Sequence, residues 1–263
     1  MSRFAWKTFA LYAPDEVEVA FKDISESRYD GIELSVDEAQ NTKKTELLSR
    51  KYELQVACVT SGFMNNLDSV DNAKKAIDLC NKLGVEYTLY LPPIRNTLSW
   101  QQFIAYTRDV CKYADEKGVV PTVHHHTGTL VETLEDSERF LHDVDMKNLG
   151  ICFDTAHAEL FSNPEEWTKR LGEKIKYVHV KDLTKNKGDP KIEKEKITLG
   201  SKEYRSIATN FTDLGVGAID FKGIFSSLKK NRYDGWISVE MEVQRVSRKE
   251  HLRKNLSILK IYS

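Results

Sequence analysis

Four side chains of the kinds that bind divalent metals stand near the ends of four separate apolar segments. They are His124, Asp154, His179 and Glu240. Two imidazoles and two carboxylates make a mixed nitrogen and oxygen ligand set, which suits Mn²⁺, Co²⁺, Fe²⁺ or Zn²⁺ better than Ca²⁺ and leaves coordination positions for substrate oxygens. One such histidine is more often a hydrogen-bonded structural group. Four separated segments that each end in a potential ligand, in a chain with seven histidines, favour a metal site.

Other polar side chains stand close to the same segment ends. Because side chains alternate along a strand, His126 shares a face with His124, and Lys181 shares a face with His179. His125 points to the opposite face and receives no role in the site. The pattern therefore adds an imidazole and an ammonium group to the four candidate ligands.

Three more residues near segment ends are candidates for a functional site. His157 follows Asp154 by three residues. Trp6 and Phe63 lie near the ends of the first and third apolar segments, where their rings fit either a sugar-stacking pocket or the hydrophobic core. Two further histidines, at positions 142 and 251, fall on expected helices and are interpreted as structural.

Short segments rich in β-branched and aromatic residues alternate with longer segments of helical period. The predicted strands are 4–11, 31–35, 55–61, 87–92, 120–126, 149–154, 175–182 and 235–242. The predicted helices are 14–27, 69–83, 100–117, 134–142, 164–171, 220–230 and 247–261. Eight strands separated by helices, in roughly 250 residues, are typical of a (β/α)8 TIM barrel. We therefore expect one domain over residues 1–263 with its polar residues at one mouth.

The expected strand ends recur at regular intervals except for the last one. From Glu33 to His179, residues near successive strand ends follow at steps of 25 to 33, close to the ~30 residues of a strand-helix-strand unit. The step from His179 to Glu240 is twice as long. The excess lies in residues 183–219, which are polar and rich in lysine, with glycines at 188, 200, 215 and 217. This long loop after the seventh strand is a candidate lid over the mouth and a place for a short hairpin.

Charge and hydropathy argue against several classes of partner. The chain carries 39 basic and 40 acidic residues with the signs interleaved, so nucleic acid is not an expected partner. No apolar run approaches the ~20 residues that span a bilayer, and the first residues do not resemble a leader, which predicts a cytoplasmic protein without membrane contact. Four cysteines without a Cys-x-x-Cys pair are expected as buried thiols. A small molecule is the expected partner, and the terminal segments are candidates for a homo-oligomer contact.

Several runs of the sequence carry a resemblance to a known family. They are 31–34 (Gly-Ile-Glu-Leu), 124–133 (His-His-His-Thr-Gly-Thr-Leu-Val-Glu-Thr), 154–157 (Asp-Thr-Ala-His), 179–182 (His-Val-Lys-Asp) and 233–240 (Tyr-Asp-Gly-Trp-Ile-Ser-Val-Glu). Together they resemble the xylose-isomerase-like barrel superfamily of sugar isomerases, epimerases and dehydratases. The resemblance implies a divalent metal held by Asp154, His179 and Glu240 with a fourth ligand from the fifth strand. Mn²⁺ is the expected ion, with Co²⁺, Fe²⁺, Zn²⁺ or Mg²⁺ as alternatives.

The fifth strand departs from the pattern of the isomerases and epimerases in this superfamily. Their strand reads Glu-x-His-x-Gly-Thr, whereas this chain has His124 at the first position and keeps His126 at the second. In the epimerases, two metal-bound glutamates on opposite faces of the sugar exchange a proton, so the replacement removes one base. A triple histidine followed by Gly-Thr is instead similar to the inosose dehydratase branch, whose enzymes remove water from a keto-cyclitol.

The chemistry shared by these enzymes suggests a role for each candidate. A carbonyl and a neighbouring hydroxyl of the substrate would chelate the metal, whose charge stabilises the enolate as a proton leaves the α-carbon. Glu240 is the candidate base, and His126 or His157 the candidate acid for the departing hydroxyl. Lys181 is a candidate for stabilising the enolate or a hydroxyl. Glu33 is either a group that orients a metal ligand without binding the metal itself or a structural carboxylate.

The sequence therefore favours a metal-dependent lyase that dehydrates a keto-cyclitol or keto-sugar. A sugar or sugar phosphate isomerase or epimerase, with another group in place of the missing glutamate, is the first alternative. Cleavage of a 3-keto-glycoside is a related lyase reaction, and a non-catalytic sugar-binding barrel is a third possibility. An abasic-site endonuclease is disfavoured by the near-zero net charge and by too few ligands for a three-metal cluster.

Overall fold

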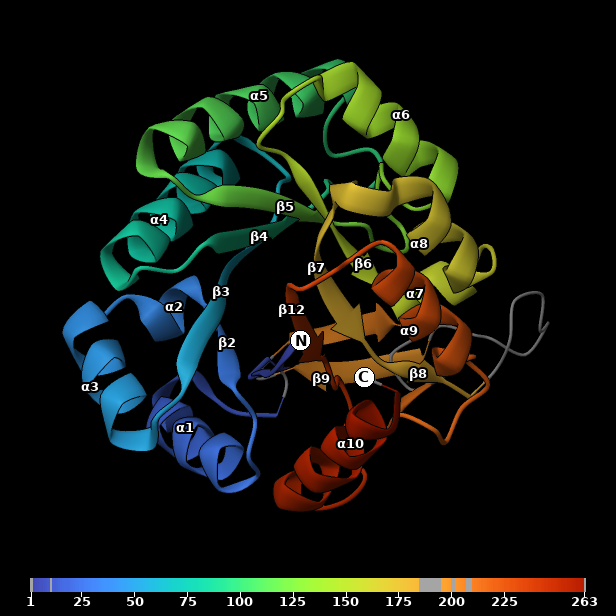
Figure 1. Ribbon diagram of the computed structural model, residues 1–263. Coiled ribbons are helices and arrows are strands. Elements are labelled where there is room, and N and C mark those ends of the chain that lie inside the picture. Colours follow the sequence, from blue (N-terminus) through green and yellow to red (C-terminus); the bar gives the residue numbers. More distant parts are fainter. Residues whose placement is uncertain (1, 10, 185–194, 200–201, 207–209, 263) are drawn as a thin grey trace.

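The strands of the main sheet close into a parallel barrel, which confirms the expected TIM barrel. The computed structural model describes residues 2–9, 11–184, 195–199, 202–206 and 210–262. Within them, the strand order around the barrel is β1-β12-β7-β6-β5-β4-β3-β2 (Figure 1). The barrel strands are β1 (Arg3–Lys7), β2 (Gly31–Ser35), β3 (Gln55–Phe63), β4 (Tyr87–Leu91), β5 (Val120–His124), β6 (Gly150–Asp154), β7 (Ile175–Val180) and β12 (Trp236–Val239).

Helices surround the barrel and close the ring where α10 lies beside α1 (Figure 1). They are α1 (Val17–Glu26), α2 (Val36–Ala39), α3 (Thr42–Tyr52), α4 (Leu67–Leu83), α5 (Trp100–Lys117), α6 (Leu134–Val144), α7 (Thr155–Glu159), α8 (Pro164–Leu171), α9 (Phe221–Lys230) and α10 (Arg248–Tyr262), with 3₁₀ turns at Pro14–Glu16 and Gly172–Lys174. All seven predicted helices are confirmed, with small differences at their ends. Among the described residues, no helix combines the length and apolar composition needed to cross a bilayer.

Within the described part of the chain, three helices were not predicted, and the absence of a sequence signal for each has a physical reason. The helix α3 buries only Thr45 and Leu48 of its length, so its apolar period is weak. The helices α2 and α7 are single turns that start from capping side chains, Ser35 and Asp154. Capping chemistry at a strand end, rather than hydrophobic periodicity, is what produces these two turns.

Some strands end earlier than predicted. The first strand stops at Lys7 rather than at residue 11, because the chain turns there and the Thr8 carbonyl accepts hydrogen bonds from the N–H groups of Leu11 and Tyr12. Strands β7 and β12 end at Val180 and Val239. Lys181 and Glu240 consequently stand just beyond the last paired residue of their strands, at the mouth of the barrel.

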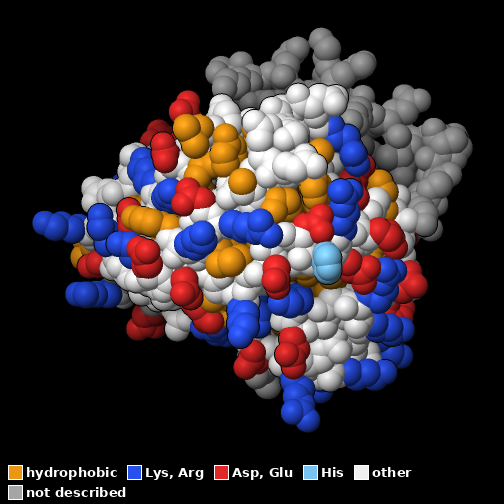
Figure 2. Space-filling model, turned by 90° about the horizontal axis from the view of Figure 1, so that it is seen from above, with side chains coloured by type: hydrophobic (Ala, Val, Ile, Leu, Met, Phe, Trp, Pro, Cys, Tyr) orange, Lys and Arg blue, Asp and Glu red, His pale blue; other side chains and the backbone are white. Residues whose placement is uncertain are grey.

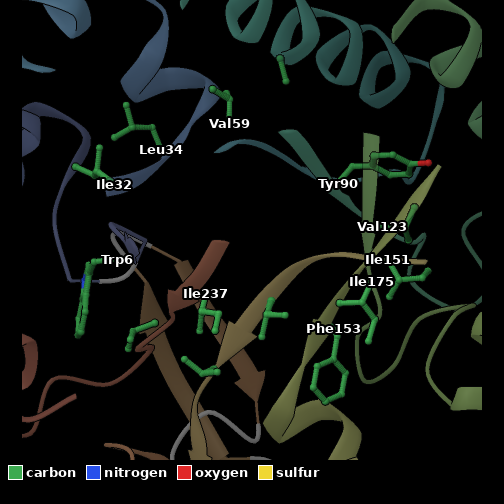
Figure 3. Close-up of a cluster of buried hydrophobic side chains, with 14 of the residues drawn as sticks. Trp6, Ile32, Leu34, Val59, Tyr90, Val123, Ile151, Phe153, Ile175 and Ile237 are labelled. Carbon is green, nitrogen blue, oxygen red and sulfur yellow. The ribbon is translucent and has the colours of Figure 1, made fainter. Parts of the chain in front are cut away.

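The two faces of the barrel strands carry different side chains. The outward face holds large apolar residues such as Leu34, Val123 and Phe153, which pack under the helices (Figure 3). The inward face holds a smaller apolar cluster that includes Cys152 and Tyr177. Because side chains alternate, the next inward positions on β6 and β7 belong to the polar residues at the mouth. An apolar plug thus fills the barrel beneath the polar groups.

The cysteines and the surface charges (Figure 2) agree with what the composition indicates. The four cysteines are buried and free of disulfides. On the face shown in Figure 2, lysine and arginine side chains are intermixed with aspartate and glutamate. The basic and acidic residues that alternate along the sequence are therefore also mixed on this face of the protein.

The long segment after β7 contains the expected hairpin. Strands β9 (Glu195–Leu199) and β10 (Lys202–Ser206) pair antiparallel, and so do β8 (Asp182–Leu183) and β11 (Phe211–Thr212). The glycines at 188 and 200, noted in the sequence, lie outside the described residues. The function of this segment as a lid stays a prediction.

Asp182 fastens the two ends of this segment to the barrel. Its carboxylate accepts hydrogen bonds from the backbone N–H groups of Leu183 (2.8 Å), Gly215 (3.0 Å), Gly217 (2.9 Å) and Ile219 (3.1 Å). A Cβ at position 217 would lie 2.3 Å from Asp182 Oδ1, so this close approach requires glycine. One side chain therefore sets where the segment leaves and rejoins the mouth.

Replacing Asp182 by alanine should destabilise the barrel, because four backbone donors lose their acceptor together. A buried donor without a partner costs about 1–3 kcal/mol, so the free energy of unfolding in urea should fall by about 3 kcal/mol or more. The matched control is Asp71→Ala, which removes an exposed carboxylate from α4 and should change stability by less than about 0.5 kcal/mol. Equal losses in the two variants would contradict the anchoring role of Asp182.

Candidate metal centre

The four candidate ligands selected from the sequence meet at the mouth of the barrel. His124, Asp154, His179 and Glu240 each offer one ligand atom, and these atoms all lie within 4.8 Å of one another. The residues come from the ends of β5, β6 and β7 and from the position after β12. All four are buried. Their convergence follows from the closed barrel, which brings the carboxyl ends of neighbouring strands to one level.

Several candidate ligand atoms lie close together but form no ordinary hydrogen bond with one another. His124 Nε2 lies 3.4 Å from Asp154 Oδ2 and 3.6 Å from Glu240 Oε2. His179 Nδ1 lies 3.2 Å from Glu240 Oε2 without hydrogen-bond alignment. Asp154 Oδ2 and His179 Nδ1 are buried and have no hydrogen-bond partner among the described residues. Unpartnered polar atoms of this kind are costly, and a divalent cation between them would satisfy both.

Neighbouring groups orient the candidate ligands. Glu33 Oε2 lies 2.9 Å from His179 Nε2, so the carboxylate accepts the Nε2 proton and leaves the Nδ1 lone pair for the centre. Thr60 donates to the other oxygen of Glu33 at 2.8 Å. Asp154 Oδ1 accepts the N–H groups of Ala156 (2.9 Å) and His157 (2.8 Å), which reserves Oδ2 for the centre.

His125, which has no role in the sequence interpretation, supports a ligand from the outer face of the barrel. Its ring stacks on Trp167 with 4.1 Å between centroids. Its Nε2 accepts a hydrogen bond of 3.0 Å from the backbone N–H of Asp154. The middle imidazole of the triple-histidine run therefore fixes the backbone from which a candidate ligand projects.

Two lysines neutralise part of the charge of the centre, and one of them was missed from the sequence. Lys181 Nζ lies 2.9 Å from Glu240, 2.8 Å from Glu242 and 3.3 Å from Asp154. Lys7 Nζ lies 2.8 Å from Glu240 and 3.5 Å from Glu33. Lys7 occupies the last inward position of β1, so the alternation rule applied to that strand would have found it.

The charged groups of the centre carry an excess of negative charge that a divalent cation would balance. Four carboxylates, those of Glu33, Asp154, Glu240 and Glu242, face the ammonium groups of Lys7 and Lys181. Metal ligation requires neutral imidazoles, and in that form two negative charges would stay uncompensated. A divalent cation would remove this excess, and the nitrogen and oxygen donors suit Mn²⁺, Fe²⁺, Co²⁺ or Zn²⁺.

The ionisation of these groups follows from the same contacts. Burial alone would raise the pKa of Asp154, but Lys181 and nearby histidines hold it well below its usual value. Despite burial, His179 and Lys7 lower the pKa of Glu33 to about 2. Burial would lower the pKa of His179, yet the surrounding charges, among them Glu33 and Glu240, raise it. A cation at the centre would compete with that proton for Nδ1.

A second polar group lies beside the centre. The rings of His126 and His157 are 4.1 Å apart, and they lie 5.6 Å and 5.5 Å from the ring of His124. Burial lowers the pKa of His126 to about 3 and the pKa of His157 well below its usual value, so both imidazoles are neutral at pH 7. Phe63 packs edge-on against His126, and Phe211 against His157.

Not every candidate from the sequence lies at the mouth. Trp6 is fully buried in the hydrophobic core, with its ring 5.7 Å from that of Tyr29, and it appears among apolar side chains in Figure 3. It points outward from β1, because Lys7 takes the inward position. The structure therefore places Trp6 apart from the polar groups, whereas Glu33 and Phe63 lie against His179 and His126.

The chain belongs to the xylose isomerase-like TIM barrel family, whose model matches residues 21–262. The inosose dehydratase of Clostridium beijerinckii is 33% identical over 150 residues, which are 56% of this chain and 48% of that protein. The chain spans about half the length of the curated relatives it matches.

Solved structures share the fold at lower identity. The probable 3-DHS dehydratase AsbF from Bacillus anthracis aligns with a TM-score of 0.77 and 18% identity over 98% of both chains. IolI, solved with a zinc atom, aligns at 0.76 and 18% over 99% of both chains. A D-allulose 3-epimerase from Methylomonas sp. in complex with D-allulose aligns at 0.76 and 16%, covering 100% of this chain and 97% of the epimerase. These likenesses show the barrel architecture.

Glu33→Gln should lower the affinity of the protein for Mn²⁺ and Zn²⁺ by about 10–100-fold in calorimetric titrations, because the His179 ring loses its carboxylate partner. The matched control is Glu38→Gln, a nearby buried glutamate whose Oε2 accepts from Thr8 and Ser35 instead. This control should change stability but leave metal affinity within about twofold of the wild type. Unchanged affinity in Glu33→Gln would remove Glu33 from the metal centre.

Proposed function

We propose that this protein is a divalent-metal-dependent lyase that removes water from a keto-cyclitol or keto-sugar, in the manner of an inosose dehydratase. The observation that carries the proposal is the buried cluster of His124, Asp154, His179 and Glu240, with unpartnered ligand atoms and neutral imidazoles beside it. Membership of the family and the inosose dehydratases among its relatives support the choice of substrate class.

The four clustered side chains would hold the metal, with Mn²⁺ as the proposed ion. Zn²⁺ is the principal alternative, because IolI was solved with zinc. When bound, the ion would supply the positive charge that stabilises an enolate formed beside a carbonyl. Lys181, ionised and held by three carboxylates, would stabilise negative charge on a substrate oxygen at the edge of the same centre.

Glu240 and the two histidines of the pair are the candidate groups for proton transfer. Glu240 is an ionised carboxylate at the mouth, so it can accept a proton from the α-carbon. Its two oxygens contact Lys7 and Lys181, which hold its pKa well below the usual range and make it a weak base. His126 and His157 are neutral at pH 7, so a histidine that protonates the departing hydroxyl must first take up the proton that leaves the substrate carbon.

Removal of the metal should abolish water loss. The full chain, stripped with a chelator and checked by elemental analysis, should lose at least 100-fold in turnover of an inosose, because the enolate charge is no longer stabilised. Added Mn²⁺ should restore the rate. Asp154→Asn should reproduce the loss even with excess Mn²⁺, while Asp71→Ala should keep the wild-type rate. Unchanged turnover after complete metal removal would refute the proposed mechanism.

Sugar isomerisation or epimerisation is the second candidate, because Glu240 and His126 are two groups that can exchange a proton with substrate carbon. Incubation with keto-sugars in D₂O distinguishes the two reactions. Dehydration should release water and form an unsaturated product, whereas epimerisation would place deuterium on the α-carbon without elimination. Binding in calorimetry without exchange or elimination would point to a sugar-binding barrel. A cytoplasmic location and self-association stay predictions from the sequence.

A further inference from the structure

Thr127 contacts both histidines of the pair, and it does so with opposite hydrogen-bonding functions. Its carbonyl oxygen lies 2.8 Å from Nδ1 of His126. Its backbone N–H and its hydroxyl lie 3.4 Å and 2.8 Å from Nδ1 of His157. A carbonyl can only accept and a backbone N–H can only donate, so the first contact requires a proton on Nδ1 and the second requires a bare Nδ1.

The proton of each neutral ring is thereby placed. His126 carries its proton on Nδ1, so its Nε2 has a lone pair. His157 carries its proton on Nε2, and this nitrogen is buried without a hydrogen-bond partner among the described residues. We propose that Thr127 holds His126 and His157 in opposite tautomers, so that the pair presents one proton acceptor and one hydrogen-bond donor to the substrate.

The turn that follows the histidines keeps Thr127 in place. Gly128 has a φ of 82°, a conformation that favours glycine. The one donor hydrogen of the Thr129 hydroxyl lies within reach of the carbonyls of His126 (2.7 Å) and Val131 (3.0 Å), and His126 N–H donates to the Val131 carbonyl (3.0 Å). The run Thr-Gly-Thr is thus a rigid support, which makes Thr127 a positioning residue.

The assignment rests on the proposed dehydration and gives each histidine a different part in it. The C–H bond of the α-carbon breaks, its proton goes to Nε2 of His126 rather than to Glu240, which the two lysines make a weak base, and its electron pair moves toward the carbonyl oxygen to form the enolate. The enolate then re-forms the carbonyl, and its electron pair forms the new carbon–carbon double bond as the C–O bond to the β-hydroxyl breaks. The imidazolium of His126 then gives that proton to the hydroxyl, which leaves as water, and the ring returns to its neutral form. His157 donates a hydrogen bond from Nε2 throughout and transfers no proton.

Only one of the three Thr127 contacts depends on the side chain, which yields a matched pair of variants. Thr127→Ser keeps the hydroxyl that donates to His157. Thr127→Val keeps the shape of the side chain but removes the hydroxyl, whose contact of 2.8 Å is the stronger of the two with His157. The backbone contact of 3.4 Å that remains is long for a hydrogen bond and holds the tautomer less firmly. The contact with His126 uses the carbonyl and is common to all three proteins.

Long-range ¹H–¹⁵N correlation spectra of the full chain, labelled on histidine and loaded with diamagnetic Zn²⁺, read the tautomers directly. The His126→Gln and His157→Gln variants assign the signals. Wild type and Thr127→Ser should show His126 protonated on Nδ1 and His157 protonated on Nε2. Thr127→Val should leave His126 unchanged and give His157 a mixed population. The same tautomer on both rings of the wild type, or an unchanged His157 in Thr127→Val, would overturn the proposal.

Turnover provides a second readout and separates this proposal from the proposed function. With an inosose, Thr127→Val should lose about tenfold or more in kcat/KM, the size of effect typical of an orienting partner, while Thr127→Ser stays within about twofold. His126→Gln should abolish exchange of the α-proton with D₂O, and His157→Gln should retain it. Retained exchange in His126→Gln would overturn the assigned roles. If the wild type removes no water at all, the proposed function fails, whereas the spectra still decide the tautomers.

Discussion

The gathering of three buried carboxylates and one partly buried carboxylate at one point is the constraint on which the rest of the mouth depends. Glu33, Asp154, Glu240 and Glu242 would repel one another strongly in a region with little water, and two lysines compensate only half of their charge. The neutral donors of the cluster, His124 among them, add no further negative charge. A divalent cation is the simplest group that would balance the excess negative charge. The same cation would supply the positive charge that the proposed reaction needs at the substrate carbonyl.

The barrel makes this concentration of charge possible because each strand carries apolar packing residues along its length and polar residues at its end. Lower inward positions, such as Cys152 and Tyr177, build an apolar plug. The next inward positions on the same strands are Asp154 and His179. Outward positions pack under the helices, and even there His125 is used to fix the backbone of Asp154. A polar cluster can therefore be held rigidly at the mouth, because the apolar residues on both sides of the sheet stabilise the strands that carry it.

The strands and the four clustered residues could be predicted from the sequence because both depend on local patterns. Alternation and apolar runs locate the strands, and polar residues at their ends fall at one mouth once the barrel closes. Alternation along β1 marks Lys7 as an inward residue, but its role in the centre, like that of Glu242, depends on contacts across the barrel that no local pattern shows. Trp6 could not be separated from a site residue, because the end of β1 depends on the turn at Thr8. The anchoring by Asp182 joins positions more than thirty residues apart, which no local pattern reveals.

His124 now has a physical consequence beyond its departure from the family pattern. A glutamate at this position would add a negative charge to a centre that already carries an excess, and it would also offer a second basic oxygen. An imidazole that donates its lone pair to a metal has no basic nitrogen left for the substrate. Under the proposed function, proton transfer then falls to Glu240, a base weakened by two lysines, or to His126, two residues further along the chain. His124 and the proposed tautomer of His126 are therefore two parts of one arrangement. A histidine at position 124 removes a base from the metal ligands, and the tautomer that Thr127 gives to His126 supplies a base beside them.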